Sequence, residues 1–189
     1  MSDAERQTWD QRYRELGATT REPATWIVAQ KEYLPAHGRA LDVAGGTGRH
    51  AVWLAQQGLD VTLADISTEG LTLAGQVAET ARVTVRTLQT DLAETGLPMG
   101  PWDLILCSHY LDRDVYRQFA PALAPGGTLL FIHPTIRNLE RHDRPGRRFL
   151  LAENELLTLV TGLTICRYDE GWSDEDRHEA KLVARRIMT

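Results

Sequence analysis

A glycine-rich run after residue 40 constrains this chain more than any other feature. Residues 40–50 read ALDVAGGTGRH, an apolar strand that passes through a glycine turn into a helix. Such a turn brings backbone N–H groups and the positive end of a helix close to a nucleotide-like ligand. Asp65, nineteen residues after Gly46, closes the next strand at about the spacing of a carboxylate that binds ribose hydroxyls. Together the two features predict a cofactor site.

The identity of the cofactor depends on the residues around the turn. Residues 46–51 also fit the dinucleotide pattern G-x-G-x-x-G/A, which by itself allows a nicotinamide cofactor. Asp42 lies in the strand, four residues before Gly46, and favours another family. The stretch 42–48 resembles the acidic-x-Gly-x-Gly-x-Gly motif of class I S-adenosylmethionine-dependent methyltransferases, with Ala44 in place of the first glycine. A small residue fits there if its φ is negative. The structural alternative is an ordinary strand-to-helix turn.

Composition fits one compact domain. The chain has 189 residues, 42% of them hydrophobic and 25% charged, which is enough for a full core. A net charge of −5 argues against nonspecific binding to nucleic acid or membranes, since both require a basic surface. No apolar run reaches membrane-spanning length, the N-terminus does not resemble a signal peptide, and Cys107 and Cys166 form no disulfide or metal-binding pattern. We therefore expect a cytoplasmic protein that acts on a small molecule and holds no metal.

Strands and helices alternate as they do in parallel-sheet proteins. The expected strands are 39–44, 59–64, 83–88, 102–107 and 128–133, and the expected helices are 48–57, 68–80 and 114–123. Before them, a capping box at residues 2–5 begins a helix that Gly17 ends, and a second helix runs from Pro23 to Pro35. Residues 1–36 thus form a helical cap on a core of residues 37–189. A helix near 155–160 and an antiparallel hairpin of strands 163–168 and 180–187 complete the chain.

The terminal hairpin extends the resemblance over nearly the whole chain. Class I methyltransferases have an α/β, Rossmann-like sheet of seven strands in the order 3-2-1-4-5-7-6, with an antiparallel last strand and helices on both faces. We expect this fold here. Residues 9–13 (WDQRY) and the helix start at 48–50 resemble the small tellurite-resistance and thiopurine-type methyltransferases. The alternative is that Trp9 and Tyr13 only dock an amphipathic helix.

The resemblance implies contacts on the methionine side of S-adenosylmethionine. Tyr13 hydrogen-bonds the cofactor carboxylate, Asp42 orients water or the amino group, and Cys107 lines this side. The glycines that let the backbone approach the cofactor are Gly45, Gly46 and Gly48. The structural alternative for Cys107 is a small buried apolar residue.

On the nucleoside side, the resemblance implies that Asp65 accepts both ribose hydroxyls and that Ile66 packs on the adenine face. Asp91 accepts from the exocyclic amine, and the backbone of Leu92 donates to the ring. The structural alternative for Asp91 is a helix cap.

Methyl transfer requires few groups from the protein. A sulfonium methyl is already activated, so transfer requires an aligned nucleophile, and a base only if that nucleophile carries a proton. The candidate bases His109, Tyr110 and His133 follow strands whose carboxyl ends form the ligand edge of the sheet. Residues 108–111 (SHYL) lack the Asn/Asp-Pro-Pro-Tyr/Phe signature of enzymes that methylate amide or base nitrogens. Nucleic-acid and glutamine methylation therefore lose support.

The loop 137–148 is basic in an otherwise acidic chain. Its place after the fifth strand predicts that Arg147 and Arg148 bind an anionic substrate, either as fixed groups or as part of a closing lid. The alternative is a solvated surface.

The sequence thus predicts a methyltransferase that transfers a methyl group from S-adenosylmethionine, leaving S-adenosylhomocysteine. The predicted acceptor is a small molecule with an oxygen, sulfur or chalcogen nucleophile, anions included, and the predicted state is a monomer or homodimer. An NAD(P)-dependent oxidoreductase and a non-catalytic S-adenosylmethionine-binding regulatory module are the alternatives.

Overall fold

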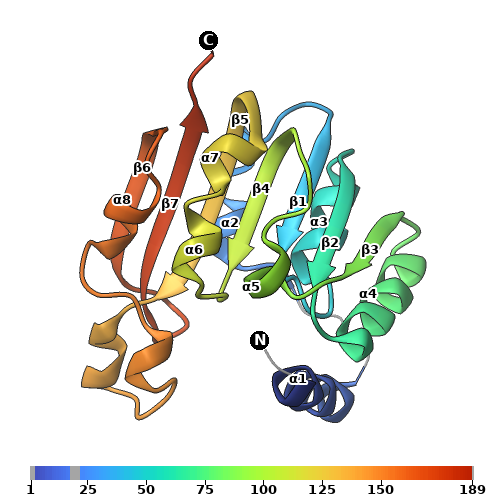
Figure 1. The fold of residues 1–189 in the computed structure, drawn as a ribbon, viewed down its shortest axis with the longest axis horizontal. Coiled ribbons are helices and arrows are strands. Elements are labelled where there is room, and N and C mark those ends of the chain that lie inside the picture. The colour runs from blue at the N-terminus through green and yellow to red at the C-terminus, as the bar shows by residue number, and fades with distance from the viewer. Residues whose placement is uncertain (1–2, 18–21, 189) are drawn as a thin grey trace.

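One mixed sheet of seven strands organises the computed structural model, which describes residues 3–17 and 22–188 (Figure 1). The strand order is β3-β2-β1-β4-β5-β7-β6. The first five strands run parallel, whereas β7 is antiparallel to both β5 and β6. The strands are β1 Arg39–Val43, β2 Asp60–Asp65, β3 Val85–Gln89, β4 Trp102–Ser108, β5 Leu123–Pro134, β6 Leu163–Trp172 and β7 His178–Arg186. The predicted fold class and strand order are confirmed.

Eight α-helices and three 3₁₀ turns surround the sheet within the described residues. The helices are α1 Asp3–Leu16, α2 Thr25–Val28, α3 Arg49–Gln56, α4 Thr68–Thr80, α5 Leu92–Thr95, α6 Arg113–Tyr116, α7 Phe119–Ala122 and α8 Glu155–Leu159. The 3₁₀ turns are Lys31–Tyr33, Ile136–Glu140 and Arg147–Phe149. Gly17 ends α1 as predicted, since it has a φ of 68° and its N–H donates to the Tyr13 carbonyl. Ser2, the first residue of the predicted capping box, lies outside the described residues.

Two predicted helices are broken, and each break has a local cause. The helix expected at 114–123 is two short helices, because Pro121 has no N–H to donate to the Arg117 carbonyl and its ring clashes there. The helix expected from Pro23 to Pro35 stops at Val28. There Gln30 donates its backbone N–H to the Ile27 carbonyl and its side-chain Nε2 to the Trp26 carbonyl, which tightens the turn into 3₁₀ form.

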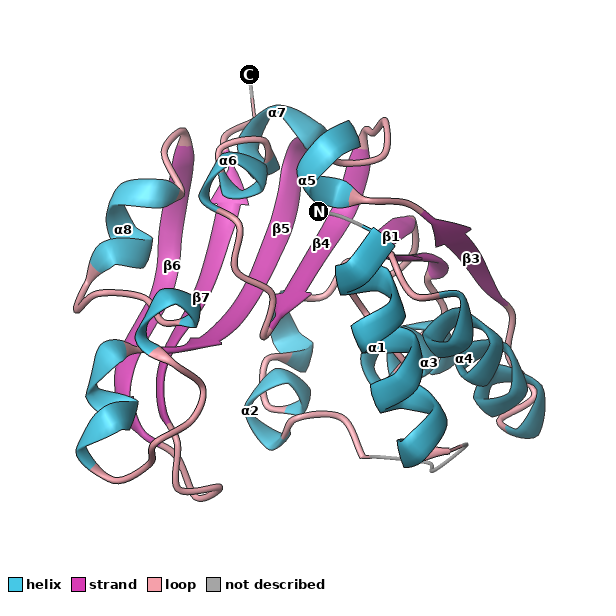
Figure 2. Cartoon of the chain, turned by 60° about the horizontal axis from the view of Figure 1, so that its bottom comes forward, coloured by secondary structure: helices cyan, strands magenta, loops and turns pink. Residues whose placement is uncertain are grey.

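The core lies on both faces of the sheet, because successive strand residues point to opposite sides. On one face Leu41, Ile105 and Phe131 pack with the residues of α6, α7 and α8. On the other face Leu104 and Leu130 pack with the residues of α2, α3 and α4. Helix α1 differs from the other long helices because it buries no residue and lies beside α4 (Figure 2). None of the helices in the described ranges is long and apolar enough to cross a membrane.

Candidate active site

The turn after β1 has three residues in the left-handed region. Ala44 has a φ of 53°, Gly46 of 56° and Gly48 of 80°. The condition for an unstrained alanine at this position, a negative φ, is therefore not met. The Gly45 N–H donates to the Ala64 carbonyl of β2 at 3.3 Å, and the Gly48 N–H donates to the Gly45 carbonyl at 3.0 Å. These bonds curl the chain back over the end of β1, and an alanine in that conformation costs about 1–2 kcal/mol.

The glycines of this turn leave room for neighbouring protein groups that a Cβ atom would displace. A Cβ on Gly45 would lie 2.6 Å from the Asp42 Oδ2, and a Cβ on Gly46 would overlap the hydroxyl of Tyr13. At Gly48 a Cβ would lie 2.9 Å from the Cβ of Ala74, so this glycine serves the close packing of α3 on α4. The structure thus brings Asp42 and Tyr13, both predicted for the methionine side, onto the glycine turn. The expected role of Gly48 in cofactor approach stays a prediction.

Asp42 is a fully buried acid at the end of β1. Its exposed fraction is 1%, and neither carboxylate oxygen has a hydrogen-bond partner among the residues that the structure describes. Burial and the neighbouring Asp65 carboxylate together raise the pKa of Asp42 to about 7, although the Ala51 backbone N–H and the Arg49 charge oppose them. A buried acceptor of this kind costs free energy unless a donor reaches it. The site therefore suits a ligand that brings a cationic or N–H donor to Asp42.

Asp65 connects the glycine turn to the β2–α4 turn. Its Oδ2 accepts from the Gly46 N–H and its Oδ1 from the Ser67 N–H, both at 2.8 Å. Burial raises the pKa of Asp65, and these bonds oppose that effect. Each carboxylate oxygen has a second acceptor site, so two hydroxyls could still bind. The ribose contact stays a prediction, but Asp65 also has a structural role that the sequence did not indicate.

A cleft of about 460 Å³ lies next to these turns. It is lined by Asp3, Arg6, Ile66, Gln89, Thr90, Asp91 and Glu94. Its volume falls within the range of small-molecule pockets. The structure thus brings together Ile66 and Asp91, two of the three predicted adenine contacts. Asp91 also caps α5 by accepting from the Ala93 N–H at 3.1 Å, which is the structural alternative considered for it.

Two of the predicted cofactor residues have side chains in the core. Leu92 follows Asp91 and is 3% exposed, so only its backbone is placed to serve a ligand. Cys107 is 0% exposed within the apolar cluster and donates its thiol weakly to the Tyr110 carbonyl at 3.8 Å. It packs as a small apolar residue and does not line the cleft. This packing is the structural alternative considered for Cys107, and its expected contact with the cofactor stays a prediction.

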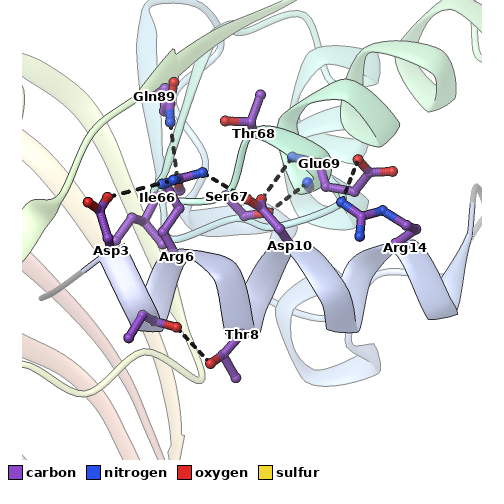
Figure 3. A network of polar contacts seen from close by, with 12 residues as sticks. Asp3, Arg6, Thr8, Asp10, Arg14, Ile66, Ser67, Thr68, Glu69 and Gln89 are labelled. Atoms are coloured by element: carbon purple, nitrogen blue, oxygen red, sulfur yellow. Dashed lines mark hydrogen bonds and ion pairs between the residues drawn. The ribbon is translucent and has the colours of Figure 1, made fainter.

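Helix α1 lies over the β2–α4 turn and is held there by polar contacts (Figure 3). The Asp10 Oδ1 accepts from the Ser67 hydroxyl at 2.6 Å and from the Glu69 N–H at 3.1 Å. Arg6 pairs with the other Asp10 oxygen at 3.1 Å. Because Asp10 is an anion at the start of α4, it also interacts favourably with that helix dipole. Tyr13, stacked on Trp9, is carried by this helix to Gly46.

The second half of the site lies at the carboxyl ends of β4 and β5 and at the amino end of β7. His109 follows β4 with a φ of 58°, and its N–H donates to the Ile132 carbonyl at 2.9 Å. Its Nε2 lies 2.9 Å from the Glu179 Oε1 of β7. The His109 side chain is 26% exposed and that of Glu179 only 5%. Sequence reasoning missed Glu179; a lone carboxylate among the apolar residues of the last strand is the signal that could have found it.

The other two candidate bases are poorly suited to take a proton. Burial lowers the pKa of His133 to about 4, so the ring is neutral near pH 7. Its Nε2 lies 2.9 Å from the Phe149 carbonyl, which can only accept, so Nδ1 carries the lone pair and has no partner among the described residues. Burial and Asp112 raise the pKa of Tyr110, whose hydroxyl is likewise buried and without a described partner. The Tyr110 hydroxyl therefore keeps its proton near pH 7 and can donate a hydrogen bond.

The basic loop has an anchored part and a free part. Arg141 pairs with Asp176 at 2.7 Å and stacks on Trp172 at 3.8 Å, which fixes the loop to the β6–β7 hairpin. Arg147 and Arg148 are exposed and form no ion pair within the described residues. Figure 1 shows this loop (orange) and α1 (dark blue) beyond the same edge of the sheet. The anchored part is not a free lid, whereas the arginine pair is available to a ligand.

Comparison with known proteins agrees with this geometry. A family model described as "Methyltransferase domain" matches residues 40–127, just under half of the chain. The Bacillus subtilis protein "Putative methyltransferase YqeM" is 36% identical over 126 residues, which are 61% of this chain and 49% of that protein. The chain thus spans about half the length of this curated relative.

Two solved structures show the same fold. One, described as "Conversion of a Disulfide Bond into a Thioacetal Group during Echinomycin Biosynthesis", has a TM-score of 0.74 at 20% identity and covers 97% of this chain and 92% of its own. TehB from Haemophilus influenzae has a TM-score of 0.71 at 20% identity, with 94% of this chain and 67% of TehB covered.

Residues 40–127 match the methyltransferase family model, and the seven strands follow the order of the class I S-adenosylmethionine-dependent methyltransferase fold. The resemblance drawn from the glycine motif is confirmed, and S-adenosylmethionine is the cofactor of such a domain. The site residues fit it, since Asp42 lacks the donor that an amino group brings, and Ile66 and Asp91 line one cleft. The tellurite-resistance branch stays a prediction, because the likeness to TehB shows the fold alone.

Proposed function

We propose that this chain is an S-adenosylmethionine-dependent methyltransferase that methylates a small-molecule acceptor at oxygen, sulfur or another chalcogen. The observation that carries the proposal is a convergence of buried polar groups. Asp42, Tyr110 and His133 come from the ends of the adjacent strands β1, β4 and β5, and each has a buried polar atom without a partner in the described residues. Orphaned polar atoms are rare in folded proteins, and three at the carboxyl edge of a parallel sheet favour a ligand site.

The cofactor, when bound, supplies an electrophilic methyl group on a sulfonium. Asp42 accepts from its amino group and Tyr13 donates to its carboxylate, both at the glycine turn. Asp65 accepts from the ribose hydroxyls at its two remaining acceptor sites, and Ile66 and Asp91 hold the adenine in the cleft. These roles place the methionine end of the ligand at the glycine turn and the adenine end in the cleft.

The acceptor binds between β4 and the arginine pair. His109 is the exposed base on this side, while Tyr110 donates a hydrogen bond. Arg147 and Arg148 extend the site toward solvent and provide guanidinium groups for an anionic acceptor. The exclusion of water by the bound reactants and their alignment supply most of the acceleration, as expected for transfer of an activated methyl group. We propose a cytoplasmic location and a monomer or homodimer.

Ligand binding tests the cofactor assignment. We expect S-adenosylmethionine and S-adenosylhomocysteine to raise the melting temperature of the wild type, and NAD to leave it unchanged. Asp42→Asn should abolish the shift, and Glu140→Gln, which changes an exposed carboxylate of the basic loop, should retain it. Stabilisation by NAD alone would identify an oxidoreductase and refute the proposal.

Turnover then tests catalysis. The wild type is incubated with S-adenosylmethionine and a panel of thiols, phenols, carboxylates, selenite and tellurite, and release of S-adenosylhomocysteine is measured. We expect turnover with at least one acceptor that carries an oxygen, sulfur or other chalcogen nucleophile. Cofactor binding without turnover of any panel member would instead support a non-catalytic binding module.

A further inference from the structure

We propose that Glu179 is a positioning residue that holds His109 as the base for a protic acceptor. The inference rests on the proposed function and deepens it, because it assigns the base atom and the class of acceptor. Its basis is the 2.9 Å contact between the His109 Nε2 and the Glu179 Oε1, made at the edge where the orphaned atoms of Tyr110 and His133 lie.

The backbone of His109 is shaped for this contact. A φ of 58° is uncommon outside glycine and costs free energy that the surrounding structure must offset. The bond from the His109 N–H to the Ile132 carbonyl holds that conformation against β5. The imidazole therefore reaches across the end of β5, where Pro134 and Glu179 are paired, to the carboxylate on β7.

The carboxylate decides which ring nitrogen is the base. The Glu179 side chain is 5% exposed, and the His109 hydrogen bond and the charges of Lys181 and Arg177 outweigh burial and lower its pKa. An ionised carboxylate only accepts, so the His109 Nε2 carries the ring proton and Nδ1 carries the lone pair. Among the described residues, Nδ1 has a hydrogen-bond contact with the Ser108 hydroxyl, and that contact is long, at 3.3 Å. An acceptor O–H or S–H can take that place.

This arrangement specifies the reacting group of the acceptor as neutral and protic, a thiol, phenol or alcohol. As the lone pair of the oxygen or sulfur forms its bond to the methyl carbon, the methyl–sulfonium bond breaks and its electron pair stays on the leaving sulfur. The proton of the acceptor goes to the His109 Nδ1, and the imidazolium that results lies against the Glu179 carboxylate. The reacting atom of an oxyanion such as selenite or tellurite carries no proton that must leave, so the His109–Glu179 pair gives these acceptors no advantage.

The first measurement requires neither cofactor nor acceptor. Nitrogen-15 NMR of the uniformly labelled protein reports the tautomer of His109, whose signals are assigned by their loss in His109→Gln. We expect the Nε2–H tautomer in the wild type and in the control Glu140→Gln, and a mixture of tautomers in Glu179→Ala. The Nδ1–H tautomer in the wild type would overturn the proposal.

The second measurement uses the best protic acceptor of the panel. We expect Glu179→Ala and His109→Gln each to lower kcat about 100-fold, with no further loss in the double variant, because the two groups act as one unit. Cofactor affinity should stay within twofold of the wild type. Urea unfolding reports whether each variant folds, and Glu179→Gln, which retains the side-chain shape, provides the kinetic comparison if Glu179→Ala does not. A folded Glu179 variant with unchanged kcat would overturn the proposal.

A failure of the proposed function can be distinguished from a failure of the base assignment. If the proposed function is wrong, the wild type itself will not bind S-adenosylmethionine or will not methylate any acceptor. A wild type that methylates only oxyanions would leave the methyltransferase standing and overturn the base assignment alone.

Discussion

Replacing Asp42 by asparagine should change apo stability and cofactor affinity in opposite directions. The side chain is fully buried at the end of β1 and lacks a described partner for either oxygen. Burial raises the pKa of Asp42 from its usual 3.8 to about 7 in the folded chain. Between these two values the folded state binds more protons than the unfolded state, so the carboxyl group destabilises the fold progressively as pH rises.

The size of this effect follows from the shift. With about 1.4 kcal/mol for each pKa unit, ionisation of Asp42 lowers the free energy of unfolding by roughly 4 kcal/mol at pH 8 and by roughly 2 kcal/mol at pH 5. Asparagine does not ionise, although its unpaired amide costs about 1–3 kcal/mol at any pH. That constant cost cancels when two pH values are compared. The variant should therefore gain about 2–3 kcal/mol relative to the wild type on going from pH 5 to pH 8.

Urea unfolding of both proteins at pH 5 and pH 8, without ligand, measures this difference. The comparison must be made between variant and wild type, because buried histidines such as His133 titrate in part of the same range with the opposite sign. Calorimetry at pH 8 measures the second half of the prediction, a loss of at least about 30-fold in S-adenosylmethionine affinity from removing one partner of a buried charge pair. Parallel pH dependences would refute the buried-acid reasoning, and unchanged affinity would separate Asp42 from the cofactor.

Three further changes test other parts of the site. Gly46→Ala should destabilise the chain by about 1–2 kcal/mol, since φ is 56° and the new Cβ overlaps Tyr13. In urea unfolding, the same change should cost less in a Tyr13→Ala background, because the overlap is then removed. Equal losses of stability in both backgrounds would contradict the contact. Relative to the wild type, His133→Gln should gain about 3 kcal/mol in stability on going from pH 6.5 to 4, because the His133 ring destabilises the wild type by about that much as the unfolded chain takes up a proton that the folded ring binds only near its pKa of about 4; a difference that stays constant with pH would contradict it. The double variant Arg147→Ala, Arg148→Ala should raise the KM of an anionic acceptor about tenfold, with kcat and cofactor affinity unchanged. An unchanged KM would show that the two arginines are solvated surface residues that do not bind the acceptor.

The strand order was predictable because the central strands are nearly continuous apolar runs. Residues 104–107 and 128–132 are buried on both faces, which is the pattern of a parallel sheet covered by helices. The charged stretch before β7 marked the hairpin. The boundaries were less accurate, since β5 begins at Leu123 instead of 128 and β6 continues to Trp172. Ladder pairing with β4 and β7 sets those limits, and no local residue type signals them.

The glycine turn and its carboxylates could be placed from spacing, because consecutive chain segments build that half of the site. The other half depends on distant segments. Glu179 meets His109 only because β7 lies beside β5, and residue type does not reveal the left-handed turn that aims the imidazole. Burial makes Tyr110 and His133 poor bases and leaves His109 as the candidate base, a ranking that sequence reasoning could not give.

Ala44 offers the sharpest discrimination between sequence expectation and structure. With the expected negative φ, Ala44→Gly would cost about 1 kcal/mol in unfolded-chain entropy, and Ala44→Val would be nearly neutral. With the observed φ of 53°, glycine relieves about 1–2 kcal/mol of strain and offsets that entropy, whereas a β-branched residue becomes a severe outlier. We therefore expect Ala44→Gly to unfold within about 1 kcal/mol of the wild type and Ala44→Val to lose more than about 2 kcal/mol. Urea unfolding decides between the two orders. A valine variant as stable as the wild type would show that the turn after β1 does not bend as described, and the positions of Asp42 and Tyr13 on it would fall with that result.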